Sequence, residues 1–181
     1  MGRGAREDAE FRRKTVGCLD GLFGFALALS RDRAVAEDLV QEAYVRALKA
    51  ARRPLASDDV RPWLFTILHN VWRNERRRRV AEPLDDMPEI LETAVAIQPS
   101  AEEDLDRGAA SDSIRRAIDD LPETYREVVA LRFSEGFSYQ QIAATLDCPA
   151  GTVMSRLARA RALIKKAVLA TRVPRVVGGR T

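Results

Sequence analysis

The side chains best suited to contact another molecule lie in residues 150–166, AGTVMSRLARARALIKK. At about 100° per residue of a helix, the larger apolar residues fall on one side. They are Val153, Leu157, Ala160 and Ile164. The opposite side carries small residues that let a backbone approach base edges, and one arginine able to donate two hydrogen bonds to a guanine. These outward residues are Ser155, Ala158, Arg159 and Ala162.

Positive charge surrounds that outward side, and no acidic residue follows Asp147. Cations there suit the phosphates of a nucleic-acid backbone. They are Arg156, Arg161, Lys165 and Lys166. The alternative is an ordinary two-helix hairpin with a solvated basic face. A helix cap at Ser138, a helix breaker at Pro149 and the two-sided pattern together favour a helix that contacts DNA bases.

A preceding helix must hold this one in place, and the sequence marks both of its ends. Ser138 and Gln141 have the S-x-x-Q spacing of a capping box, which starts a helix. Residues 147–151, DCPAG, stop it, because proline disfavours a helix in the residue before it. Thr152 is suited to cap the next helix. The pattern predicts a helix-turn-helix.

A second candidate surface lies on residues 61–79, RPWLFTILHNVWRNERRRR, which predict a helix with Pro62 in its first turn. One side is apolar: Leu64, Ile67, Leu68 and Val71. The other mixes amides, rings and cations, as a site for single-stranded or melted DNA would. Its residues are Thr66, His69, Arg73, Arg76 and Arg77, bordered by Phe65, Asn70, Trp72 and Asn74. A core aromatic pair beside a solvated basic helix end explains this pattern equally well, and His69 is expected at the surface.

The composition of the 181 residues is that of a soluble globular protein, with 46% hydrophobic and 31% charged residues. The net charge of +3 is small, but basic residues gather in 73–79 and after 156, and acidic ones in 82–112. The apolar run Leu22–Leu29 is too short to span a bilayer, and no convincing signal peptide precedes it. We therefore expect a cytoplasmic protein without membrane insertion.

Cofactor and metal chemistry find little support in the sequence. Cys18 and Cys148 are far apart, and His69 is the single histidine, so no zinc site is assembled. Both cysteines are expected to be reduced and structural, and a redox role for Cys148 stays open. Without an activated nucleophile or a ligand cluster, an enzyme is not expected.

The remaining patterns predict an all-α fold of two small helical domains joined by a flexible acidic linker. Residues 16–29 suggest a buried helix, and residues 34–51 an amphipathic one. The apolar side of the second is Leu39, Val40, Ala43, Ala47 and Leu48. Residues 52–59 read as a loop, and Leu121-Pro122 splits two short helices. The expected division is a frayed 1–10, a domain 11–80, a linker 81–111, a helix-turn-helix domain 112–171 and a basic tail 172–181.

The order of these parts resembles the extracytoplasmic-function sigma factors, over nearly the whole chain. AEDLVQEAYVRAL is similar to the polymerase-binding helix of that family, RPWLFTILHNVWRN to its −10 helix, and the segment from Leu121 to Arg161 to its −35 domain. The resemblance implies binding to core RNA polymerase, through the coiled coil of the β′ clamp and the β subunit, and to promoter DNA. It also implies an anti-sigma factor as a partner.

The resemblance assigns roles to individual residues. Asp38, Gln41 and Glu42 would contact polymerase, although alone they would be read as a solvated acidic face. The −10 strand would be held by Phe65, Asn70, Arg73, Asn74 and Arg77. The −35 duplex would be met by Met154, Ser155, Arg156, Ala158, Arg159 and Lys165. Relatives often carry a cation where this chain has Met154, which could pack against a thymine methyl group.

The main alternative is a conventional helix-turn-helix repressor or activator that does not depend on polymerase. Such a protein has no use for the acidic face at Asp38, Gln41 and Glu42, and it is expected to bind palindromic half-sites as a dimer. The face therefore discriminates between the two functions.

Overall fold

The structure is a computed structural model that describes residues 2–50, 54, 59–79 and 107–172. All regular structure within these residues is helical, which confirms the all-α prediction. The predicted acidic linker falls largely outside the described residues. Most of the predicted loop 52–59 and all but Arg172 of the predicted tail lie outside them as well.

The N-terminal half consists of α1(Gly2–Val16), α2(Leu19–Ser30), α3(Arg33–Lys49) and α4(Arg61–Arg79). The segment expected to be frayed is helical from Gly2. The helix expected over residues 16–29 is interrupted at Gly17 and Cys18, because glycine weakens the helix there.

The turn between α2 and α3 is built by Arg31 and Asp32. Arg31 adopts a left-handed conformation with φ of 57°, which costs about 1–2 kcal/mol for a residue with a side chain. Asp32 then caps α3, where its carboxylate accepts a hydrogen bond of 3.0 Å from the amide of Val35. The two helices thus reverse direction within two residues.

The buried stripe of α3 includes one wrong prediction. Leu39, Val40, Ala43 and Ala47 are buried as expected, whereas Leu48 is 43% exposed. At about 100° per residue, Leu48 lies roughly a third of a turn from the centre of that stripe. It belongs to the outer surface of the helix.

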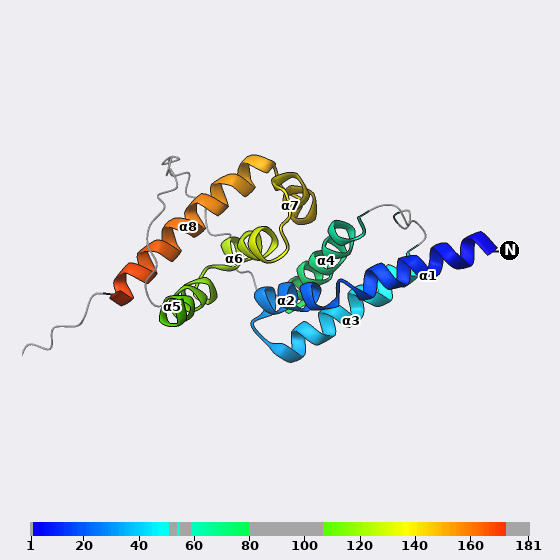
Figure 1. The fold of residues 1–181 in the computed structure, drawn as a ribbon, viewed down its shortest axis with the longest axis horizontal. Coiled ribbons are helices and arrows are strands. Elements are labelled where there is room, and N and C mark those ends of the chain that lie inside the picture. The colour runs from blue at the N-terminus through cyan, green and yellow to red at the C-terminus, as the bar shows by residue number, and fades with distance from the viewer. Residues whose placement is uncertain (1, 51–53, 55–58, 80–106, 173–181) are drawn as a thin grey trace, which may run out of the picture.

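The C-terminal half consists of α5(Arg107–Asp119), α6(Glu123–Val129), one turn of π-helix η1(Ala130–Ser134), α7(Tyr139–Leu146) and α8(Ala150–Arg172). The predicted split at Leu121-Pro122 is confirmed, since α5 ends before it and α6 begins after it. α7 and α8 form the helix-turn-helix (Figure 1).

The predicted capping box of α7 is present. Ser138 Oγ accepts from the amide of Gln141 at 3.2 Å, and the amide of Ser138 donates to Gln141 Oε1 at 2.8 Å. The prediction for Thr152 is wrong: α8 begins at Ala150, and the amide of Thr152 donates to the carbonyl of Pro149. Proline fixes the turn, so the helix starts directly after it.

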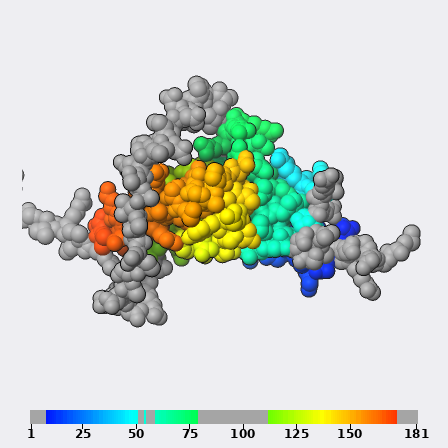
Figure 2. Space-filling model, turned by 90° about the horizontal axis from the view of Figure 1, so that it is seen from above, coloured from blue at the N-terminus to red at the C-terminus, as the bar shows by residue number. Residues whose placement is uncertain are grey.

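The two halves share one hydrophobic core. Phe65 of α4 lies between Phe25 of α2 and Phe137, with ring centroids 5.5 and 5.1 Å from its own. α4 packs on α2 and α3 on one side and on α7 on the other. Figure 2 shows the surfaces of α4 and of the C-terminal helices meeting without a gap. The sequence predicts two helical domains, and the structure adds that they pack against one another.

Replacing Phe65 with alanine should lower the free energy of unfolding by about 3–5 kcal/mol, because it leaves a cavity in the shared core. Phe133→Ala is the matched control, since Phe133 is 59% exposed and should cost less than about 1 kcal/mol. Urea unfolding followed by circular dichroism measures both. Equal losses for the two variants would contradict the position of Phe65 in the core.

Candidate nucleic-acid and partner-binding surfaces

The outward side of α8 is arranged as the sequence predicts. Val153, Leu157 and Ala160 are buried in the core. The opposite residues are exposed: Met154, Ser155, Ala158, Ala162 and Lys165. Arg159 is half-buried beside them. The side chains on this side of the helix are small, and cations lie at its edge. A helix of this kind can enter the major groove of DNA.

Arg156 is an exception among the predicted DNA contacts. Its Nη1 atom lies 3.1 Å from Oε1 of Glu127, whose side chain is only 8% exposed. In this conformation the guanidinium of Arg156 therefore forms an ion pair with Glu127 of α6, which helps to hold α8 against the rest of the C-terminal half.

Three residues of α4, Phe65, His69 and Trp72, lie deeper than expected. Phe65 is fully buried, so its ring cannot stack on a base in this conformation. His69, expected at the surface, is also buried. The reason is that α4 is covered on two sides, by α2 and α3 and by α7, whereas helical periodicity anticipates one buried side.

The other predicted −10 residues lie nearer the solvent. Asn70, Asn74 and Arg77 are exposed, and Arg73 is half-buried. Nη1 of Arg73 lies 3.6 Å from Oδ2 of Asp147, at the end of α7. The amides and cations of α4 thus lie along the edge of the interface between α4 and the C-terminal half, which we call the seam.

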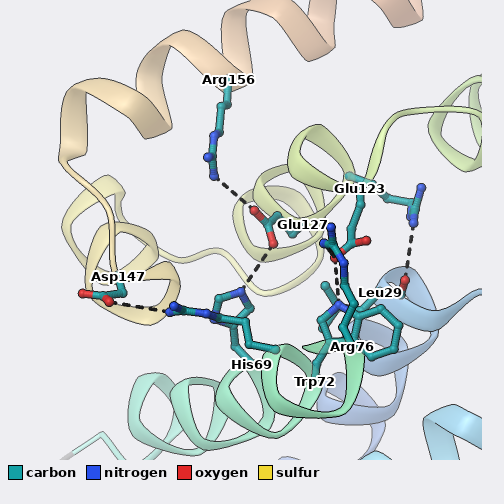
Figure 3. A network of polar contacts seen from close by, with 10 residues as sticks. Leu29, His69, Trp72, Arg76, Glu123, Glu127, Asp147 and Arg156 are labelled. Atoms are coloured by element: carbon teal, nitrogen blue, oxygen red, sulfur yellow. Dashed lines mark hydrogen bonds and ion pairs between the residues drawn. The ribbon is translucent and has the colours of Figure 1, made fainter. Parts of the chain in front are cut away.

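Three polar residues that the sequence did not single out lie at the interface between the two halves, and Figure 3 shows two of them, Glu123 and Glu127. Glu127 of α6 accepts from Arg156 and lies 3.5 Å from Nε2 of His69. Glu123 accepts from Nε1 of Trp72 at 2.8 Å and from Nη1 of Arg76 at 3.0 Å. Arg126 of α6 is buried against α2, and this burial lowers the pKa of its guanidinium. No local pattern marks these residues, because their partners are distant in sequence.

The predicted acidic face of α3 points outward. Asp38, Gln41 and Glu42 are all exposed, and Glu42 pairs with Arg46 of the same helix at 2.7 Å. Val45 and Leu48 are exposed on the same side, at 37% and 43%. Residues at these spacings share one surface of a helix, so the face combines carboxylates with two apolar side chains.

The cysteines are placed as structural residues. Cys18 is buried and donates to the carbonyl of Lys14, and Cys148 is half-buried. Burial raises the pKa of both thiols, which leaves little of the reactive thiolate at neutral pH. In the parts of the chain that the structure describes, histidine, cysteine and carboxylate side chains form no cluster suited to a metal ion. None of the helices in the described ranges combines the length and hydropathy of a transmembrane span.

Two family models match the chain in order. The model described as "Sigma-70 region 2" matches residues 18–82, which include α2, α3 and α4. The model described as "Sigma-70, region 4" matches residues 111–164, which include the helix-turn-helix. Together the two matches span both helical halves.

Full-length relatives agree with these matches. The chain is 35% identical over 150 residues to the ECF RNA polymerase sigma factor EcfG of Rhodopseudomonas palustris, covering 83% of this chain and 80% of the relative. It is 36% identical over 141 residues to the ECF RNA polymerase sigma-E factor of Escherichia coli, covering 72% of each chain.

A solved structure has a similar fold. The sigma factor RpoE of Bartonella quintana, in complex with the anti-sigma factor NepR, superimposes with a TM-score of 0.64 and 31% sequence identity. The match covers 90% of this chain and 98% of the other. The similarity therefore includes both halves.

Proposed function

The chain belongs to the extracytoplasmic-function family of RNA polymerase sigma factors and acts as an alternative sigma factor, and we propose which of its surfaces binds core polymerase and which bind promoter DNA. The observation that carries the proposal is the order of the two matched regions, with a helix-turn-helix whose reading side is exposed. A repressor independent of polymerase would not need the region-2 half.

The outward side of α8 would read the −35 duplex. Ser155 and Ala158 let the backbone approach the bases, and Arg159 is the side chain suited to a guanine. Met154 is exposed next to Ser155, where it would pack against a thymine methyl group or a sugar. Lys165 would bind phosphate without regard to sequence.

The exposed edge of α4 would hold the melted −10 strand. Its groups are Asn70, Arg73, Asn74 and Arg77, which combine amide donors and acceptors with cations. Phe65 is left out of this set because it belongs to the core.

The outer face of α3 would dock on core polymerase, at the coiled coil of the β′ clamp. Its carboxylates suit a basic partner, and exposed Val45 and Leu48 add apolar area next to them. A second contact, with the β subunit, would involve the C-terminal half.

The remaining roles follow from the family and the relatives. An anti-sigma factor is a proposed partner, because the similar RpoE forms a complex with NepR. The chain would act in the cytoplasm, where its polymerase partner is found, and would catalyse no reaction of its own.

Reconstitution with core polymerase tests the function as a whole. Purified chain is mixed with core enzyme and a template carrying the promoter upstream of its own operon. Specific transcripts that depend on the chain are expected. A chain that binds DNA but never redirects core polymerase would contradict the proposed function.

Arg159→Ala should remove about 1–3 kcal/mol of discrimination at one base pair of the −35 element, because a bidentate contact to guanine is lost. Lys165→Ala is the control, and it should weaken binding to all sequences alike. A binding series over single-base variants of the −35 duplex measures both. An unchanged preference profile for Arg159→Ala would remove this residue from the reading surface.

Asp38→Arg with Glu42→Arg should abolish co-elution with core polymerase on a sizing column, since like charges would then meet across the interface and cost several kcal/mol. Helical circular dichroism should persist, because both residues are exposed. Glu10→Arg with Asp20→Arg changes the net charge equally at exposed positions of α1 and α2, and should co-elute normally. If the first double variant co-elutes as the parent does, the polymerase contact lies elsewhere.

A further inference from the structure

Phe133 of η1 is the exposed member of the chain's six phenylalanines, all of which the structure describes. Its side chain is 59% exposed, although the turn that carries it is fixed in place. Leu131 of the same turn is buried in the core, and Arg132 donates to the carbonyl of Phe137 at 2.9 Å. Single π-helical turns are frequent at functional sites. The core thus fixes the backbone at Phe133 but does not use its ring.

The ring of Phe133 contacts an arginine of α8. The Cζ atom of Arg161 lies 5.7 Å from the centre of the ring, within the distance of a cation–π contact. Arg161 is itself exposed. We propose that Phe133 positions Arg161 to bind a phosphate of the −35 duplex, so that a ring outside α8 aligns one of its DNA contacts. The proposal rests on the proposed role of α8 and adds two residues to it.

Arg161 lies on a flank of α8 that suits a phosphate contact. At about 100° per residue it shares one side of the helix with three exposed residues, Met154, Ala158 and Lys165. This flank borders the outward side of α8. When a helix lies in the major groove, side chains at its centre meet bases, and side chains on its flanks meet the sugar–phosphate backbone. Lys165, already proposed to bind phosphate, lies one turn beyond Arg161.

Two arginines of α8 are held by partners of opposite chemistry. Arg156 pairs with Glu127 at 3.1 Å, and a carboxylate competes with phosphate because both bind a guanidinium in the same geometry. Phe133 offers Arg161 an uncharged ring without a lone pair, so the guanidinium keeps its charge and its donors for an oxygen acceptor. The ring can therefore restrict the conformations of Arg161 without competing with DNA. Ordering a side chain in advance reduces the entropy lost on binding.

The test uses holoenzyme reconstituted from the full-length chain and core polymerase. Its binding to a labelled duplex that carries the −35 element and ends before the −10 element is measured by fluorescence anisotropy over a series of salt concentrations. Arg161→Ala should flatten the slope of log K against log salt concentration by about 0.9, because one phosphate contact is lost. Phe133→Ala should weaken binding at a fixed salt concentration roughly two- to fivefold, the effect of losing an exposed cation–π contact.

Further variants separate positioning from a structural role. Phe133→Tyr keeps the ring face and should bind as the parent does, whereas Phe133→Leu is apolar without a ring and should be as weak as Phe133→Ala. In the Arg161→Ala background, Phe133→Ala should cause no further loss. Arg33→Ala is the matched control, because Arg33 of α3 lies 5.6 Å from the ring of Phe23 but is outside the helix-turn-helix. It should leave the affinity and the slope unchanged.

Each outcome decides the proposal. An unchanged slope for Arg161→Ala would overturn it, and so would parental affinity for Phe133→Ala or Phe133→Leu. Additive losses for Phe133→Ala and Arg161→Ala would also overturn it, since the ring would then act on binding without this arginine. Failure of the proposed role of α8 is distinguishable, because the parent holoenzyme would then bind the fragment no better than a duplex with a scrambled −35 element.

Discussion

Two arginines, one from each half, donate hydrogen bonds to backbone carbonyls of the other half and hold the two halves together. Arg126 of α6 donates to the carbonyls of Ala28 and Leu29 at the end of α2, and to Leu121 within its own half. Arg31, at the end of α2, donates to the carbonyls of Asp119 and Leu121 after α5. The last carbonyls of a helix have no partner within it, so each half completes the helix ends of the other. The left-handed backbone of Arg31 is offset by these bonds.

This exchange explains why α4 is buried on both sides. With α2 and α6 held together, the rings of Phe25, Phe65 and Phe137 pack into one core, and α7 lies along α4. The polar groups of α4 at the seam then need partners, which Glu123, Glu127 and Asp147 supply. The outer face of α3 and the outward side of α8 lie outside this packing and stay exposed. Asn70, Asn74 and Arg77 of α4 also stay exposed, and Arg73 is half-buried beside them.

Local patterns in the sequence account for what was predicted correctly. The capping box at Ser138, the stop after Leu146 and the two sides of α8 depend on neighbours within a few residues. The burial of Phe65 and His69 depends on residues of the other half, which periodicity along α4 does not contain. Leu48 is exposed although it is hydrophobic, because its angle on the helix turns it away from the buried stripe. No local pattern marks Arg126, because its partners in α2 lie more than ninety residues away.

The free chain folds as one closed unit held by Arg126. Trp63 packs on Phe11 within the N-terminal half, so in a Trp72→Phe background the tryptophan fluorescence reports that half, whereas circular dichroism reports all helices. In urea unfolding of the full-length chain the two transitions should coincide. Arg126→Met should shift both midpoints downward together, because it leaves buried carbonyls without donors at about 1–3 kcal/mol each. A tryptophan transition that Arg126→Met does not move would contradict the account.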